Sequence, residues 1–274
     1  MKDSADTRTL VREKYSEIAK GESSCCGKRT AASTYAGMGE TYAAVEGYVP
    51  EADLGLGCGV PTELAQIKEG DVVLDLGSGA GNDVFIARRE VGPEGRVIGV
   101  DFSAEMLERA RANMKKLGYA NIDFLEGEIE ALPLADGRVD VVISNCVLNL
   151  VPDKSAAFRE IHRVLKPGGH FCVSDIVLEG ELPEKMRKAA EFQVGCVAGA
   201  LQRKDYLYAI AEQGFEAIEA VRERAIVIPD ADLLEVLTPE ELEAFRESGT
   251  AITSLTIRAS KPGCARGSAC GGSA

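Results

Sequence analysis

The sequence has no tryptophan, only two histidines and fewer basic than acidic residues. Its 31 Lys and Arg against 44 Asp and Glu give a formal net charge of −13, which argues against a surface that binds the phosphates of DNA or RNA. No apolar run approaches the roughly 20 residues of a membrane-spanning helix, and the charged residues 1–20 lack the apolar core of a signal peptide. We therefore expect a cytoplasmic protein that binds neither nucleic acid nor a membrane.

The sequence also lacks paired metal ligands, although it contains eight cysteines. No CxxC pair occurs, and His162 and His170 are too few for the usual mixed zinc sites. In a reducing compartment thiols persist better than disulfides, so structural crosslinks are not the expected explanation either. The cysteines stand at scattered positions: Cys25, Cys26, Cys58, Cys146, Cys172, Cys196, Cys264 and Cys270.

Hydrophobic patterning becomes regular from Asp71 onward. Apolar, β-branched runs predict strands at about residues 72–76, 96–101, 122–126, 139–145 and 170–176. Helical patterns separate some of them, at about residues 82–91, 103–117 and 154–165. Strands that alternate with helices favour right-handed βαβ units, so we predict an α/β fold with a parallel sheet and helices on both faces.

The pattern changes after Asp175. A small C-terminal α+β extension is predicted, with helices at about residues 183–195 and 203–213 and strands within residues 214–228 and 251–260. A further helix is expected over residues 238–247, because Thr238 is a good N-cap and Pro239 suits a first turn. The Gly-rich end of the chain, residues 263–274, is expected to be disordered.

A glycine loop follows the first predicted strand in the stretch VVLDLGSGAGND. The strand contains Asp75, and Gly77, Gly79 and Gly81 stand at the mouth of a helix, where a ligand can approach the backbone. Asp101 ends the next strand, where a carboxylate can accept hydrogen bonds from both hydroxyls of a ribose. The spacing is GxGxG and not the dinucleotide fingerprint GxGxxG, and this variant suits a nucleoside ligand without a phosphate.

This loop, together with GVDFSAEMLERAR, EGEIEALPLADGRVDVVIS and HRVLKPGGHFCVSD, resembles class I S-adenosylmethionine-dependent methyltransferases over about residues 70–178. The resemblance implies a Rossmann-like sheet and S-adenosyl-L-methionine as the cofactor, with no tightly bound metal. It implies that Asp101 holds the ribose and Met106 flanks the adenine, with Glu128 and Ile129 near its edge. Core packing is the alternative for Met106 and Ile129. The expected cofactor-binding set is Asp75, Gly77, Gly79, Gly81, Asp101, Met106, Glu128, Ile129 and Asn145.

Three cysteine motifs make the resemblance more specific. SNCVLNLVPDK, LGLGCGVP and GCVAGAL, which contain Cys146, Cys58 and Cys196, are similar to the motifs of arsenite methyltransferases, from VREKYSEIA to about residue 228. The resemblance implies that these three cysteines bind trivalent arsenic. One member of the pair Cys25 and Cys26 matches a fourth functional cysteine, and the doublet leaves open which one. The chain departs from the family at residues 195 and 202, where Gly and Gln replace an acid and an aromatic residue.

The implied chemistry agrees with the residues present. Soft thiolates are natural ligands of trivalent arsenic, supplied as arsenite or as its thiol conjugates. The arsenic lone pair would attack the sulfonium methyl, and no general base is needed because this nucleophile carries no proton. A thiol pair such as Cys25 and Cys26 could then reduce arsenic by forming a disulfide, which thioredoxin or glutathione would reopen. The expected role is arsenic detoxification.

Other interpretations remain open at this point. The chain could methylate another small acceptor, but the motifs offer no His, Lys or Tyr at a strand end as a base. It could also be a catalytically silent metalloid sensor, although such a protein has no use for the glycine loop and Asp101. Cys172 is expected in the core, and Cys264 and Cys270 are expected to bind nothing.

The motifs divide the chain into four predicted parts. Residues 1–70 would contain helices and a cysteine loop that completes the substrate site, and residues 71–178 would form the cofactor-binding core. Residues 179–262 would hold the arsenic-binding segment and the α+β part, and residues 263–274 the tail. The final methylation state, the reductant and the oligomeric state do not follow from the sequence.

Overall fold

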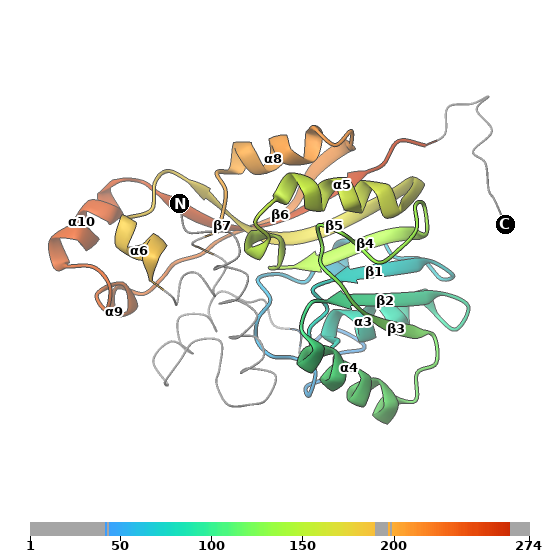
Figure 1. Cartoon of the computed structure of the whole chain (residues 1–274). Helices are drawn as coiled ribbons and strands as arrows, with labels where there is room; N and C mark the ends of the chain where they lie inside the picture. The colour runs from blue at the N-terminus through green and yellow to red at the C-terminus, as the bar shows by residue number, and fades with distance from the viewer. Residues whose placement is uncertain (1–41, 43, 190–196, 198, 264–274) are drawn as a thin grey trace.

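The computed structural model describes residues 42, 44–189, 197 and 199–263 (Figure 1). Its centre is a seven-stranded sheet with the strand order β3-β2-β1-β4-β5-β7-β6. The strands are β1 (Val72–Leu76), β2 (Arg96–Asp101), β3 (Ile122–Glu126), β4 (Val139–Asn145), β5 (Leu165–Glu179), β6 (Glu216–Ala225) and β7 (Ala251–Ser260). Five of the cysteines discussed above lie outside the described residues, namely Cys25, Cys26, Cys196, Cys264 and Cys270.

The first five strands run parallel, and β7 lies antiparallel between β5 and β6. Because β1 pairs with β2 on one side and with β4 on the other, the strand order reverses at this point, which is where open α/β sheets bind ligands. The predicted parallel α/β sheet is confirmed, and β1 to β4 have the predicted bounds. The two strands of the predicted C-terminal extension join the same sheet.

Helices cover both faces of the sheet, as the alternating pattern predicts (Figure 1). Helices α3 (Asn82–Val91) and α4 (Ala104–Leu117) lie on one face, where Phe85 and Leu107 are fully buried. Helices α5 (Lys154–Val164) and α8 (Arg203–Ala211) lie on the other, where Phe158 and Tyr206 are at most 1% exposed. The first of these faces also holds Cys172 in β5, so its predicted core position is confirmed.

A third apolar cluster lies at the end of the sheet beside the C-terminal helices. Helices α6 (Glu184–Lys188), α9 (Asp230–Leu233) and α10 (Pro239–Glu247) gather there in Figure 1, and they contribute Met186, Leu233 and Phe245 to the cluster. Helix α10 begins at the predicted Thr238 cap, which forms a reciprocal capping box with Glu241. None of the described helices is long and apolar enough to cross a membrane. Two short 3-10 turns complete the described structure, η1 (Pro61–Leu64) and η2 (Leu148–Leu150).

Candidate active site

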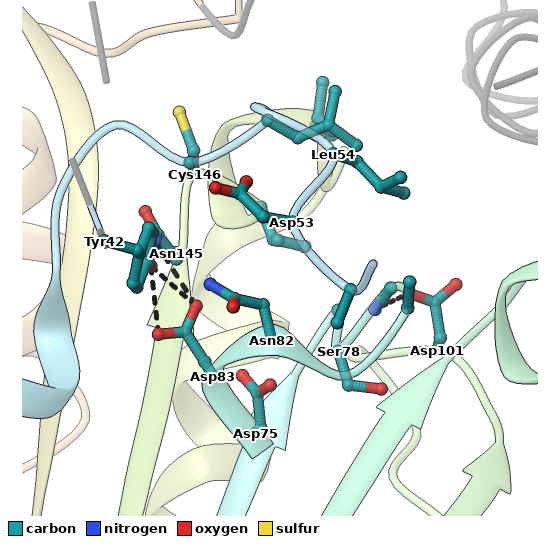
Figure 2. A pocket seen from close by; sticks show the side chains of 18 of the residues that line it. Tyr42, Asp53, Leu54, Asp75, Ser78, Asn82, Asp83, Asp101, Asn145 and Cys146 are labelled. Atoms are coloured by element: carbon teal, nitrogen blue, oxygen red, sulfur yellow. Dashed lines mark hydrogen bonds between the residues drawn. The ribbon is translucent and has the colours of Figure 1, made fainter. Parts of the chain in front are cut away.

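A cleft lies at the carboxyl ends of β1, β2 and β4, where the strand order reverses (Figure 2). The loops that follow these strands line it, together with a segment N-terminal to the sheet. Its lining residues are Tyr42, Ala52, Asp53, Leu54, Leu56, Gly57, Asp75, Gly77, Ser78, Gly79, Ala80, Asn82, Asp83, Asp101, Phe102, Asn145, Cys146, Val147 and Leu150. The cleft therefore collects the predicted glycine loop, the predicted ribose acid and one predicted arsenic ligand.

The loop after β1 depends on glycine in two different ways. Gly77 has a φ of 67°, and a Cβ atom at this position would lie 2.5 Å from a methyl group of Val147. Gly79 has a φ of 50°, and a Cβ atom there would face open space. Residues with a side chain rarely adopt such a positive φ. Gly77 thus lets the loop pack under Val147, and Gly79 exposes its backbone to a ligand in the cleft.

Asp101 is held in place at the end of β2 by backbone amides. Its Oδ2 accepts a hydrogen bond of 2.9 Å from the N–H of Gly79, and its Oδ1 accepts one of 2.8 Å from the N–H of Ser103. Burial raises the pKa of Asp101 to about 6, although these two amides favour the ionised form. A carboxylate fixed in this way can accept further hydrogen bonds from the two hydroxyls of a ribose.

Two more buried carboxyl groups, Asp75 and Asp83, line the cleft beside the glycine loop. Burial raises the pKa of Asp83 to about 6, and burial together with the nearby charges of Asp83 and Asp101 raises the pKa of Asp75 well above its usual value. The Tyr42 hydroxyl lies 3.0 and 2.9 Å from the two carboxylate oxygens of Asp83, to which it donates (Figure 2). Neither Tyr42 nor Asp83 is among the site residues predicted from the sequence. Asp83 stands inside the glycine motif VVLDLGSGAGND, but no sequence pattern marks Tyr42.

Two polar atoms of the cleft are buried without a hydrogen-bond partner in the described structure, Oγ of Ser78 and Oδ1 of Asn82. Buried polar atoms are normally paired, so each exception needs an explanation. Both atoms belong to the loop and helix start that follow β1. Oγ of Ser78 lies under the loop, where a Cβ atom on Gly99 of β2 would come within 2.7 Å of it, and it points away from the cleft in Figure 2. A polar ligand in the cleft would satisfy Oδ1 of Asn82, and a nucleoside with an amino-acid tail has groups of this kind.

Three other predicted cofactor contacts do not line the cleft. Met106 belongs to the first turn of α4 and is fully buried, and Ile129 is 8% exposed in the apolar cluster of the α5 face. Glu128 forms an isolated β-bridge with Ala131 beside it. Gly81 also lies behind the lining, where its positive φ of 97° caps the start of α3. Core packing, the alternative for Met106 and Ile129, matches their positions, and their contact with an adenine stays a prediction.

The two described cysteines of the predicted arsenic site meet at one backbone carbonyl. The oxygen of Ser174 accepts a hydrogen bond of 2.7 Å from the N–H of Cys146 and one of 3.4 Å from the thiol of Cys58. Cys58 is 1% exposed and Cys146 5% exposed, and both belong to the apolar cluster of the C-terminal helices. Cys146 has a φ of 60°, an unfavourable backbone conformation for a residue with a side chain. Strain of this kind is concentrated at functional sites.

The loop that carries Cys58 is held by the middle and by the C-terminal part of the chain. The carbonyl oxygen of Cys58 accepts hydrogen bonds of 2.8 Å from Oγ of Ser254 in β7 and 3.2 Å from the guanidinium of Arg224 in β6. Its N–H donates a hydrogen bond of 3.0 Å to Oδ1 of Asn145 at the end of β4. The C-terminal strands therefore help to fix a cysteine of the N-terminal part.

The third predicted arsenic ligand, Cys196, lies outside the described residues, but its neighbour Val197 does not. Val197 is fully buried in the same apolar cluster as Cys58 and Cys146. Within the described ranges no group of three His, Cys, Asp or Glu side chains could hold a metal ion. Two of the three predicted thiols are thus brought together by the structure, and the placement of the third stays a prediction.

Comparison with known proteins agrees with this geometry. A methyltransferase domain family matches residues 67–214. The arsenite methyltransferase of Halobacterium salinarum is 41% identical, over 95% of this chain and 68% of that protein. The chain belongs to the arsenite methyltransferase family.

Two further relatives of the arsenite methyltransferase family extend the comparison. The human arsenite methyltransferase is 36% identical over 66% of this chain, which spans about half, 50%, of that protein's length. Among solved structures, the arsenic(III) S-adenosylmethionine methyltransferase of Chlamydomonas reinhardtii matches with a TM-score of 0.64 and 36% identity, over 75% of this chain and 68% of that chain. The Rossmann-like fold and the resemblance to arsenite methyltransferases are confirmed.

Proposed function

We propose that this arsenite methyltransferase holds trivalent arsenic on the thiolates of Cys58, Cys146 and Cys196 and places it against the methyl group of S-adenosylmethionine. The observation that carries the proposal is the position of Cys146. Its side chain lines the cleft that contains Asp101 and the glycine loop, and its backbone shares the Ser174 carbonyl with Cys58. A soft ligand set thus lies at the edge of a nucleoside site.

The residues of the cleft fit S-adenosylmethionine. Asp101 would accept the ribose hydroxyls, and the unpaired Oδ1 of Asn82 would bind a polar group of the cofactor. The buried carboxyl groups of Asp75 and Asp83 would offset the positive charges of its ammonium and sulfonium groups. When bound, the cofactor supplies a methyl group on a positively charged sulfur.

The cysteines would capture arsenic by ligand exchange. Each thiol forms an S–As bond, and its proton leaves with the displaced hydroxide as water, or with a displaced glutathione. The lone pair of arsenic then forms the As–C bond while the bond between the methyl carbon and sulfur breaks and leaves its electron pair on that sulfur. Arsenic is oxidised formally by two electrons. Since the nucleophile has no proton to lose, alignment of the two reactants is the main contribution of the protein.

A further methyl transfer requires arsenic to be reduced again. The pair Cys25 and Cys26 would supply two electrons by forming a disulfide, and thioredoxin or glutathione would reopen it by thiol exchange. A reducing, cytoplasmic location would keep these thiols available, and arsenic detoxification would be the biological outcome.

The test is product speciation after incubation of the purified protein with arsenite, S-adenosylmethionine and excess thiol. Methylated arsenicals and S-adenosylhomocysteine should accumulate together. Cys146→Ser should abolish both products, because a hydroxyl is a poor ligand for a soft centre. Cys172→Ser serves as the matched control, since Cys172 is buried in a different apolar cluster from Cys58 and Cys146.

The same measurement separates the two alternatives. A methyltransferase of another small acceptor would leave arsenite unmethylated even though it binds S-adenosylhomocysteine. A silent metalloid sensor would bind arsenite and form no product. Either result with the unsubstituted protein would contradict the proposal.

A further inference from the structure

Asn145 is predicted to bind the cofactor and lines the cleft, but most of its hydrogen bonds join it to the loop that carries Cys58. Its Oδ1 accepts hydrogen bonds from two consecutive backbone amides, of 3.0 Å from Cys58 and 3.2 Å from Gly59. Its Nδ2 donates a hydrogen bond of 2.7 Å to the carbonyl oxygen of Gly59. One amide side chain therefore satisfies three backbone groups of the loop that carries Cys58, much as a strand partner would.

The loop can approach Asn145 this closely only because glycine flanks the cysteine. A Cβ atom on Gly57 would lie 2.5 Å from Nδ2 of Asn145, which is closer than real Cβ atoms come. A Cβ atom on Gly59 would lie 2.6 Å from Oγ of Ser174 on the neighbouring strand. The motif LGLGCGVP thus fits the ends of β4 and β5 through its glycines, and the cysteine between them is carried into contact with the Ser174 carbonyl.

Asn145 also touches the polar wall of the cleft. Its Nδ2 donates to the hydroxyl of Tyr42 and lies 3.4 Å from Oδ2 of Asp83, and Tyr42 in turn donates to Asp83 (Figure 2). Its neighbour in the chain is Cys146, whose side chain lines the same cleft. The Asn145 side chain therefore links the polar wall formed by Tyr42 and Asp83 to the backbone of Cys58 through hydrogen bonds. Cys146 is the next residue in the chain.

We propose that Asn145 is a positioning residue for arsenic: it fixes Cys58 beside Cys146, and its main role is not to hold the cofactor. This inference rests on the proposed function for its consequence, the capture of arsenic, but its geometric part can be tested without any arsenical. Without the amide, the N–H groups of Cys58 and Gly59 lose their hydrogen bonds to Asn145, while the carbonyl oxygen of Gly59 still accepts one of 3.2 Å from the Tyr42 hydroxyl. Cys58 is then held less firmly beside Cys146 at the Ser174 carbonyl.

The first test measures thiol accessibility in the reduced protein. Native alkylation with iodoacetamide, followed by peptide mass spectrometry, gives separate rates for Cys58, Cys146 and Cys172. In Asn145→Ala the rate at Cys58 should rise by about tenfold or more, the factor expected when at least one net hydrogen bond is lost. The rate at Cys172 should stay unchanged, because it lies in the opposite core.

Ser144→Ala is the matched control. Ser144 precedes Asn145 on β4, is 1% exposed where Asn145 is partly buried, and donates a hydrogen bond of 3.2 Å to the carbonyl oxygen of Leu76. Its removal costs a buried hydrogen bond on the same strand but has no direct effect on the Cys58 loop. The Cys58 labelling rate should therefore match that of the unsubstituted protein.

A second variant reaches the same contact from the other side. Gly57→Ala leaves Asn145 in the chain but places a Cβ atom against its amide, so the amide or the loop must shift and their contact is disturbed. It should raise the Cys58 labelling rate as Asn145→Ala does. Hydrogen exchange of the unsubstituted protein gives a reading that needs no variant: the amides of Cys58 and Gly59 should be protected.

The arsenic consequence is measured with phenylarsine oxide, a trivalent arsenical that takes two thiols, and with S-adenosylhomocysteine. Asn145→Ala should weaken phenylarsine oxide binding by about tenfold or more, and the KM for arsenite should rise likewise, as expected for one lost hydrogen bond. The Kd for S-adenosylhomocysteine and the KM for S-adenosylmethionine should change by less than about threefold, well under the effect of a lost charged contact.

The outcomes distinguish the two proposals. If the unsubstituted protein binds no arsenical, the proposed function fails, while the labelling and exchange measurements still decide the role of Asn145. If Cys58 labelling is unchanged in Asn145→Ala, or its amide exchanges freely in the unsubstituted protein, the positioning role is wrong. If Asn145→Ala greatly weakens S-adenosylhomocysteine binding and leaves arsenical binding unchanged, the main role of Asn145 is to bind the cofactor.

Discussion

The hydroxyl of Tyr206 on α8 donates a hydrogen bond of 2.9 Å to Oδ2 of Asp175 on β5. Both side chains are at most 1% exposed. Burial raises the pKa of Asp175 to about 7, although the Tyr206 hydrogen bond and the charge of Lys154 favour the ionised form. The carboxyl group is therefore protonated in mildly acidic solution, and its ionisation on the way to neutral pH costs stability.

Asp175→Asn should change how stability depends on pH. A folded pKa of about 7 stands above an unfolded value of about 3.9, so the wild-type protein loses stability as pH rises between these values. The amide cannot ionise and can still accept from Tyr206. At about pH 8 the variant should be more stable by roughly 2–4 kcal/mol, at about 1.4 kcal/mol per pKa unit, and by far less at about pH 4. Urea unfolding at several pH values measures this, and a difference that does not vary with pH would contradict it.

Cofactor binding should depend on the ionisation of Asp101. Its pKa of about 6 is raised by burial, and the ionised form accepts from ribose hydroxyls, so affinity for S-adenosylhomocysteine should fall as pH drops below about 6. Asp101→Ala should weaken binding by about 1.5–3 kcal/mol for each charged hydrogen bond lost. Calorimetry from about pH 5 to 8 provides the measurement.

Phenylarsine oxide binding should survive in Asp101→Ala, which controls for loss of the fold. Asp83 also titrates near pH 6, so Asp101→Asn is the sharper comparison: its remaining pH dependence should be smaller than that of the wild-type protein. If Asp101→Ala binds S-adenosylhomocysteine as tightly as the wild-type protein, Asp101 does not bind the cofactor.

Cys172→Ser should affect stability and not methyl transfer. The side chain lies in an apolar cluster with Val141, Ile143 and Phe124, and burial raises its thiol pKa to about 12, so it stays protonated and inert. A hydroxyl in this position should cost about 1–3 kcal/mol of unfolding free energy. Activity per folded molecule should be kept. A folded Cys172→Ser protein that fails to bind arsenite would overturn the core assignment.

The two rounds of methylation should need different thiols. Arsenite has three exchangeable positions, but trivalent methylarsenic has two, so fewer cysteines can bind it. Cys58→Ser and the Cys25→Ser/Cys26→Ser double variant should fail on arsenite yet still methylate trivalent methylarsenic with excess thiol. Cys146→Ser and Cys196→Ser should fail on both substrates.

Product analysis with each arsenical in turn makes this comparison. If Cys58→Ser loses activity equally on arsenite and on trivalent methylarsenic, the N-terminal thiols serve every turnover. The prediction that the two rounds of methylation need different thiols would then be wrong. The Asn145→Ala variant should resemble Cys58→Ser in this assay, since both remove Cys58 from its place beside Cys146.

The strands of the sheet could be predicted from the sequence because each has a hydrophobic pattern within a few consecutive residues. The strands β1 to β4 are short apolar runs, and β7 is an alternating stretch with the predicted bounds of residues 251–260. Strand β5 spans Leu165–Glu179, where residues 170–176 are predicted. It starts earlier because Leu165 already pairs with Val139, before a register shift leads to the pairing of Val141 with His170. The early start is not predicted from hydrophobic runs, because Pro167 and the two glycines after it are typical of a turn.

The contacts of the site could be predicted only in part. Gly77, Gly79, Asp101 and Cys146 stand at strand ends, and the order of the sheet brings such ends together. The hydrogen bond between Tyr42 and Asn145 joins residues 103 positions apart, and no spacing in the sequence announces it. The sequence places Asn145 at the end of a strand, which predicts a cofactor contact, but it does not reveal the loop of Cys58 that Asn145 also contacts.

The position of β7 has a consequence for synthesis on the ribosome. This strand is made after β6, yet it lies between β5 and β6, so β6 has no partner in the sheet until β7 emerges. Ser254 of β7 also holds the carbonyl oxygen of Cys58, 196 positions earlier in the chain. A growing polypeptide therefore carries Cys58 and Cys146 long before their neighbourhood is complete. The proposed arsenic site would therefore be complete only when nearly all of the described chain has left the exit tunnel.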